Sequence, residues 1–174
     1  APAQYVEEWK KIVEANFESV LLKYGVRFIK PHEVLKELEE ETEESAQLPK
    51  TEDMIYQQNN KTQFVVKLAL FTNLMQKNIA KNQFNYWDAK IAVEIYLSRE
   101  KKRIFHDIFP SQDSAYGNKL VPSEGESKKV CEELISTIAK LSANNIANYF
   151  RQHKPMPTTL NVLNFVGFNK SQKQ

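Results

Sequence analysis

Glycine, cysteine and long apolar runs are all scarce in this chain of 174 residues. Its four glycines disfavour an all-β fold with many tight turns and leave little material for phosphate-cradling loops. The single cysteine, Cys131, excludes an intrachain disulfide and a cysteine metal cluster, and its apolar neighbours predict a buried thiol. No apolar run approaches the ~18 residues of a membrane-spanning helix, so we expect no membrane span. The chain shows no signal peptide, which favours an intracellular location, with secretion after signal cleavage as the alternative.

Catalytic and metal-binding motifs are missing as well. The chain contains no His-Glu-x-x-His, no Gly-x-Ser-x-Gly, no Walker loop and no dinucleotide-binding glycine pattern. His32, His106 and His153 lie in three separate segments without the spacing of a helical metal site. These absences favour a non-enzymatic protein, and we expect neither a cofactor nor a metal ion.

Acidic and basic residues are unevenly distributed along the chain. Residues 1–53 hold 13 acidic and 7 basic side chains, whereas residues 54–174 hold 9 acidic and 17 basic ones, so the two parts carry net charges of −6 and +8. Six of the glutamates fall within residues 37–44. Such segregation creates two electrostatically distinct surfaces, which bear on partners more than on fold.

Apolar residues recur at spacings of three and four along most of the chain, which is the pattern of amphipathic helices. Gly25 is placed to cap the end of a helix over about residues 4–24, and Ser123 and Glu126 have the spacing of a capping box at the start of another, which runs to about His153. The sequence thus predicts an all-α fold, a single domain over residues 1–174 built as a bundle of about five amphipathic helices. The predicted helices begin near residues 4, 31, 61, 85 and 123.

Three segments do not fit a simple up-and-down bundle. A flexible acidic link is predicted at about residues 43–60 and a loop at about residues 110–123. The hydrophobic tail at residues 158–168 is too apolar to be a free linker. We expect this tail to fold back on the bundle, with docking on another chain as the alternative.

One short stretch suggests an enzyme. Arg99 and His106 are seven residues apart, which on a helix is two turns and therefore one face. This spacing resembles the Arg-x4–6-His motif of the HEPN family of all-α ribonucleases. The resemblance covers only this stretch, and it implies metal-independent cleavage of RNA in which Arg99 stabilises phosphate charge and His106 transfers a proton.

A nucleic-acid-binding surface is a simpler interpretation of the same region. Basic side chains close to Tyr86, Trp87 and Tyr96 combine positive charge with rings on which bases can stack. The candidate phosphate-contacting residues are Lys90, Arg99, Lys101, Lys102 and Arg103.

Elimination favours a third hypothesis, a non-enzymatic helical protein–protein interaction module that binds a partner protein or itself. The supporting features are the broad apolar surface of the helix predicted after residue 85, the apolar tail and the segregated charge. Nucleic-acid binding is kept as the alternative, and the ribonuclease as the third choice. The candidate partner-binding residues are Tyr96, Leu97, Leu160, Leu163, Phe165 and Phe168.

Overall fold

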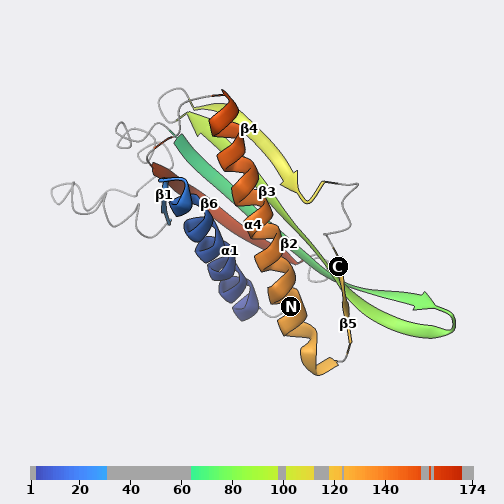
Figure 1. The fold of residues 1–174 in the computed structure, drawn as a ribbon. Coiled ribbons are helices and arrows are strands. Elements are labelled where there is room, and N and C mark those ends of the chain that lie inside the picture. Colours follow the sequence, from blue (N-terminus) through green and yellow to red (C-terminus); the bar gives the residue numbers. More distant parts are fainter. Residues whose placement is uncertain are drawn as a thin grey trace.

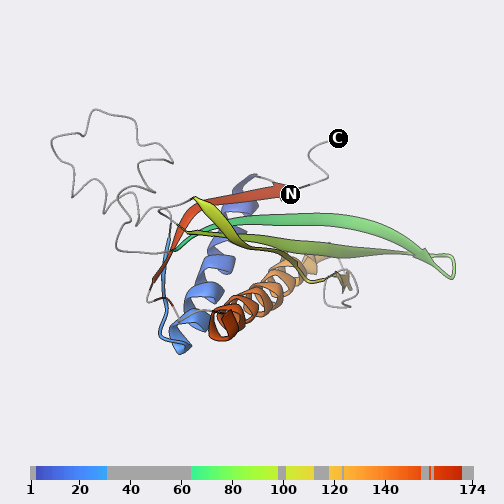
Figure 2. The same ribbon diagram turned by 90° about the horizontal axis from the view of Figure 1, so that it is seen from above.

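The protein forms a two-layer α/β fold in which two helices cover one face of a six-stranded sheet (Figures 1 and 2). This arrangement comes from a computed structural model that describes residues 3–30, 64–97, 101–111, 118–122, 124–153, 157 and 159–169. The two helices are α1 (Ala3–Lys23) and α4 (Ser127–His153), and a short 3-10 helix, η3 (Glu124–Glu126), precedes the second. The strands are β1 (Arg27–Ile29), β2 (Phe64–Ile79), β3 (Asn82–Leu97), β4 (Lys102–Phe109), β5 (Asn118–Val121) and β6 (Thr159–Asn169).

The all-α prediction is therefore wrong. The segments predicted as helices at about residues 61–82 and 85–109 are the strands β2, β3 and β4, so no five-helix bundle exists. The two helices predicted from terminal signals are present, because α1 matches the prediction for residues 4–24 and α4 ends at His153 as expected. The second predicted helix, from Pro31, and the acidic link at 43–60 lie outside the described residues.

The burial pattern explains why β3 is a strand. From Trp87 to Ile95 every second residue is buried, and the residues between them are only partly covered. This period of two places one set of side chains on the helix side of the sheet and the other on the opposite side. The apolar residues among the second set, such as Tyr96, widened the apparent helical face and produced the wrong prediction.

The order of strands across the sheet is β1-β6-β2-β3-β4, and β5 pairs with the other end of β3. The strands β2 and β3 form one long antiparallel hairpin. The strand β6 pairs with β1 on one side and with β2 on the other, and it is parallel to both. The last described element therefore lies inside the sheet. The predicted apolar tail is thus an interior strand of the same chain.

The predicted loop at residues 110–123 is partly wrong. It contains β5, which pairs with Asn85–Asp88 of β3, while residues 112–117 lie outside the described part. In β5, Nζ of Lys119 lies 2.8 Å from Oε2 of Glu133 in α4. This ion pair connects this end of the sheet to the helix.

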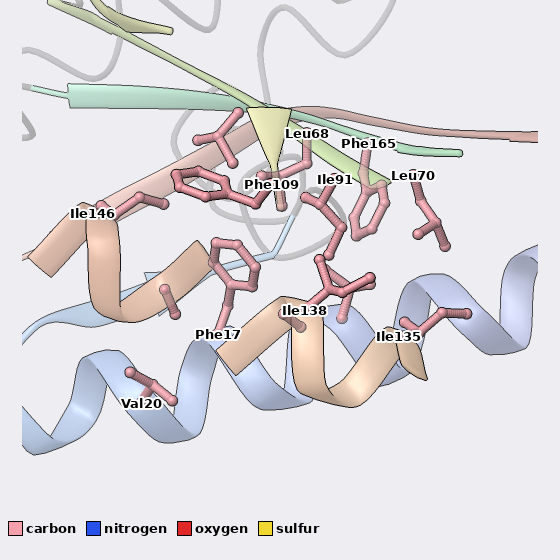
Figure 3. Packing of buried hydrophobic residues seen from close by; sticks show 14 of the residues in the cluster. Phe17, Val20, Leu68, Leu70, Ile91, Phe109, Ile135, Ile138, Ile146 and Phe165 are labelled. Carbon is pink, nitrogen blue, oxygen red and sulfur yellow. The ribbon is translucent and has the colours of Figure 1, made fainter. Parts of the chain in front are cut away.

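Both helices press their apolar faces against the same side of the sheet, and this contact forms the hydrophobic core (Figure 3). The helix α1 lies over β1 and β6, and α4 lies over β3, β4 and β5. Phe17 of α1, Ile138 of α4 and Ile91 of β3 are all fully buried there. The thiol of Cys131 is buried in the same cluster, as predicted, and this burial raises its pKa.

The end of α1 is set by a glycine cap. Gly25 has a φ of 77°, and the amides of Gly25 and Val26 donate hydrogen bonds to the carbonyls of Leu22 and Leu21, both at 3.0 Å. This is the left-handed C-terminal cap that the sequence predicts. It reverses the chain so that β1 follows α1 directly.

A second glycine permits close packing of α1 on the sheet. Gly167 of β6 faces α1, and a Cβ atom placed on it would lie 2.3 Å from Cγ1 of Val6. A side chain at this position would therefore push the helix away from β6.

The turn of the long hairpin is built without glycine or asparagine. Ala80 and Lys81 connect the paired residues Ile79 and Asn82, and their φ angles of 50° and 68° are those of a two-residue type I′ turn. Each of these left-handed conformations costs a residue with a Cβ on the order of 1 kcal/mol.

Replacing Lys81 with glycine should stabilise the hairpin by about 0.5 kcal/mol, because the relief of left-handed strain exceeds the entropy lost by glycine. Hydrogen exchange of the Ile79 and Asn82 amides, which pair across the turn, should slow in Lys81→Gly. The matched change Ala80→Val should speed it, since β-branched residues avoid positive φ. Faster exchange in Lys81→Gly would contradict the type I′ assignment.

Candidate binding surface on the open face of the sheet

The side of the sheet opposite to the helices is covered by none of the described elements, and we call it the open face (Figure 2). Its side chains are those that alternate with the core residues of each strand. On β3 they include Tyr86, Lys90, Glu94 and Tyr96, all only partly covered. An antiparallel sheet commonly leaves one face to water, but here that face carries several large aromatic and aliphatic side chains.

The hairpin β2–β3 extends beyond the rest of the sheet as an arm (Figures 1 and 2). Pairing of β2 with β6 ends at Thr72, and pairing of β3 with β5 covers Asn85–Asp88, so in the described part of the sheet residues 77–84 form a two-stranded ribbon. Beyond Thr72, residues 73–79 of β2 extend ~23 Å past the end of β6, at ~3.3 Å per residue. Every side chain that the structure describes from Leu74 to Phe84 is exposed.

Large apolar side chains gather on the open face at the base of this arm. Tyr86 pairs across strands with Met75 of β2 and with Leu120 of β5, which puts the three side chains in one row. Phe84 is two residues from Tyr86 and so lies on the same face. Met75 and Phe84 are exposed, and Leu120 is 55% exposed. We call Met75, Phe84, Tyr86 and Leu120 the arm patch.

A polar cluster occupies the open face at the other end of the hairpin, centred on Glu94. Tyr96 donates a hydrogen bond from its hydroxyl to Oε2 of Glu94 at 2.5 Å. Oε1 of the same carboxylate lies 3.8 Å from a guanidinium nitrogen of Arg103 and 4.0 Å from Nε2 of His106. Lys67 pairs directly with Glu94 across the strands, and its Nζ lies 5.1 Å from the ring centre of Tyr96. We call these five residues the Glu94 cluster.

The electrostatics of this cluster favour a protonated tyrosine. The hydrogen bond to Glu94 and partial burial raise the pKa of Tyr96, against the smaller opposing effects of Lys67 and Arg103. Tyr96 therefore remains a hydrogen-bond donor over the physiological range. Its hydroxyl holds the Glu94 carboxylate in place on the surface of the sheet.

The structure separates the predicted nucleic-acid-binding residues. Lys90 and Arg103 lie on the open face, opposite Phe71 and Tyr96 respectively. Lys101 is in the turn after β3 with a φ of 50°, and Lys102 pairs with Leu97, one residue out of phase with Arg103. Arg99 lies outside the described residues. The predicted basic helix face is therefore wrong, and of the candidates that the structure describes, Lys90 and Arg103 share the open face.

The ribonuclease resemblance loses its structural basis. It implies an all-α fold with Arg99 and His106 on one helix, whereas His106 is on strand β4, paired with Glu94. We do not carry this hypothesis further.

The predicted partner-binding residues are also divided. Leu160 and Phe165 are buried in the core, and Leu97 packs against it. Tyr96 is partly exposed in the Glu94 cluster. Leu163 and Phe168 lie on β6, and their side chains are outside the described part. Among the described side chains of this set, Tyr96 alone enters the candidate surface, and a partner-binding role for the others stays a prediction.

Other site types find little support in the described part of the chain. No group of three His, Cys, Asp or Glu side chains there lies close enough to hold a metal ion. Neither of the described helices is both long and apolar enough to cross a bilayer. A cavity of about 220 Å³ lies between the end of α1 and β1, lined by Glu18, Leu22, Val26, Arg27 and Phe28.

Sequence reasoning missed most of the open face. Met75 falls on the apolar face of a predicted helix, Phe84 between two predicted helices and Leu120 in a predicted loop, so the sequence does not identify the three as neighbours on one surface. The alternation along β3 could have located Glu94 and its neighbours. No protein-family model, no curated protein and no solved structure matches this chain, so its candidate surface is inferred from geometry alone.

Proposed function

We propose that this protein is a non-enzymatic protein-binding module and that a partner protein docks on the arm patch. The observation that carries the proposal is the clustering of Met75, Phe84, Tyr86 and Leu120 in adjacent positions on one face. A large apolar side chain gains ~1.5–3 kcal/mol when it goes from full exposure to full burial, and these four neighbours keep part of that area in water, which favours a covering surface. Aromatic and methionine side chains are also enriched in the centres of protein interfaces.

The charge around the patch indicates the chemistry of the partner. The charged residues of the arm are Lys77 and Lys81, and the nearest acidic residue along β3 is Asp88, two residues from Tyr86. Lys77 pairs directly with Phe84 across the hairpin, at the margin of the patch. We therefore expect a partner surface with apolar side chains at its centre and acidic residues around them.

Nucleic acid is supported less well as a partner. Arg103 lies beside Glu94, and Lys67 lies over the Tyr96 ring, so the charge and the aromatic surface that stacking would require are already in mutual contact. The arm patch lies apart from these groups and carries exposed apolar surface. This contrast favours protein over nucleic acid.

A photo-crosslinking side chain at position 120 should give one discrete crosslinked product, formed either with a second copy or with one protein from an extract of the native source. The matched control is position 22, because Leu22 is 67% exposed on α1, away from the arm. Adding Met75→Glu should remove the product by burying a charge against the partner, and should leave the melting temperature unchanged since Met75 is exposed.

Equal labelling from positions 22 and 120 would contradict the proposal, as would a product that survives Met75→Glu. Light scattering of the purified protein separates the two kinds of partner, because self-association would raise the measured mass without any extract.

A further inference from the structure

We infer that two side chains, Asp107 and Tyr149, close the outer edge of β4 to strand addition, so that the sheet is not extended by a second copy or by a strand of a partner. This inference is independent of the arm patch. It rests on three observations: β4 ends the described sheet, Asp107 and Tyr149 form hydrogen bonds with its backbone, and the strand is irregular at Ile104.

The strand β4 is the last one on its side of the described sheet, and it pairs there with β3. Its eight residues exceed the mean strand length of ~5–6 residues. Such a strand presents a row of N–H and C=O groups on its outer side, and another chain can pair with this row. An edge of this length therefore needs protection if the protein is not to associate through it.

Asp107 occupies one amide of this edge. Its Oδ1 accepts a hydrogen bond of 2.8 Å from the backbone N–H of Ile108. Backbone groups of an antiparallel strand point alternately to its two sides, so we assign this amide, which a side chain occupies, to the side away from β3. Asp107 is itself exposed and lies opposite Val93. A strand added here would find the amide taken and would strip water from a carboxylate.

Tyr149 of α4 occupies one carbonyl of the same strand. Its hydroxyl donates a hydrogen bond of 3.0 Å to the backbone oxygen of Ile104. Its ring packs against the rings of Phe105 and Phe150, with ring centres 5.0 and 5.4 Å apart. These contacts hold the hydroxyl in place, so the helix layer itself takes up an acceptor of the strand.

The backbone of β4 is also irregular near both of its ends. Ile104 has no partner residue in β3, because the register of the two strands shifts between Ile95 and Tyr96. A bulge of this kind increases the local twist and turns an edge away from a straight partner. Pro110 follows β4 directly and has no amide to donate. The regular part of the edge is therefore short, and it is centred on His106.

The two hydrogen bonds weaken any strand pairing at this edge. A strand placed beside β4 would bury groups opposite the Ile108 amide and the Ile104 carbonyl, and these groups would have no partner unless the bonds to Asp107 and Tyr149 broke. A buried polar group without a partner lowers affinity about tenfold or more. Two such groups lower it about a hundredfold, and the short regular edge offers few new hydrogen bonds in return.

Light scattering of the full chain over a range of concentrations tests this inference, in a Met75→Glu background that removes association through the arm patch. Asp107→Val frees the Ile108 amide, and Tyr149→Phe frees the Ile104 carbonyl. The measured mass of the double variant should rise with concentration, and each single variant should need about tenfold more protein for the same rise.

Two matched controls separate the hydrogen bonds from other effects. Asp107→Asn removes the same charge as Asp107→Val but keeps an Oδ1 acceptor, so it should stay monomeric. Tyr24→Phe removes a hydroxyl that donates to Asn144 at 3.2 Å and not to the sheet, and it should leave the mass unchanged. Asp107 is exposed, so Asp107→Val keeps the fold and remains decisive if Tyr149→Phe lowers the melting temperature.

Hydrogen exchange locates the association. The His106 amide, two residues from Ile108, points outward by the same alternation, so it should exchange fast in the unsubstituted chain and slow in the double variant as the mass rises. The inference is overturned if Asp107→Val gains no more mass than Asp107→Asn at any soluble concentration. Slow exchange of the His106 amide in the unsubstituted monomer would also overturn it, because the edge would then already be covered.

Discussion

Truncation of the chain after Pro157 should prevent folding. The truncation removes β6, which lies between β1 and β2 and is parallel to both. It also removes Leu160, Val162 and Phe165 from the core, and each buried side chain of this size is worth ~2–5 kcal/mol. Their sum of ~6–15 kcal/mol is comparable to the ~5–15 kcal/mol that stabilises a typical domain.

Circular dichroism and thermal melting measure this effect. The truncated chain should show no cooperative melting transition and a large loss of sheet signal. A chain ending at Asn169 keeps the whole of β6 and serves as the control, with the melting transition of the full chain. A truncated protein that melts cooperatively near the temperature of the full chain would contradict the interior position of β6.

Gly167→Ala should destabilise the protein by ~1–2 kcal/mol, although alanine is ordinarily the better residue within a strand. The added Cβ would lie 2.3 Å from Cγ1 of Val6, far inside van der Waals contact, and overpacking of this kind costs ~1–3 kcal/mol. The usual gain from replacing glycine in a strand, ~0.5–1 kcal/mol, offsets only part of that. Denaturant unfolding at constant m-value measures the difference.

A double-mutant cycle identifies the cause. In Val6→Ala the clashing Cγ1 is absent, and the Cβ of residue 6 would lie 3.7 Å from the new methyl group, an ordinary contact. Gly167→Ala should then cost little in the Val6→Ala background, which gives a coupling energy of ~1 kcal/mol or more. Gly125→Ala is the matched control, because a Cβ there meets no atom within 4 Å. Additive effects of the two changes would show that α1 does not press on Gly167.

The parts of the fold that the sequence predicted are those with distinct terminal signals. The helix α1 ends at a glycine whose positive φ no other residue adopts as easily, and this made Gly25 a dependable boundary. The helix α4 has a long apolar face, and Pro155, two residues after its last residue, marks its end in the sequence. In both helices the spacing of the apolar residues favours a helix locally, and the same residues pack against the sheet.

The long hairpin could not be predicted in the same way, for two physical reasons. Its strands are 16 residues each, about three times the mean strand length, and a segment of that length with apolar residues on both faces also satisfies a helical period. Its turn uses Ala80 and Lys81 in place of the asparagine and glycine that normally identify a type I′ turn. Without that signal, the apolar pattern of the two strands predicts two separate helices.

The candidate surface was predicted in fragments. Tyr96, Arg103 and His106 were each identified from the sequence, but as parts of three different hypotheses. Their proximity depends on the register of β3 with β4, including the bulge between Ile95 and Tyr96, and no local pattern specifies this register. Glu94, the residue on which they converge, had no distinguishing feature of its own.

The interior position of β6 also sets the order in which a growing chain can fold. During synthesis α1 and β1 leave the ribosome before β6, yet among the described strands β6 is the one that β1 joins. Until β6 follows, the outer edge of β2 lacks this partner along Val65–Thr72, the apolar part of its length. Such an edge is open to pairing with other nascent chains, so folding of this protein should depend on protection, by chaperones or by low concentration, until β6 inserts.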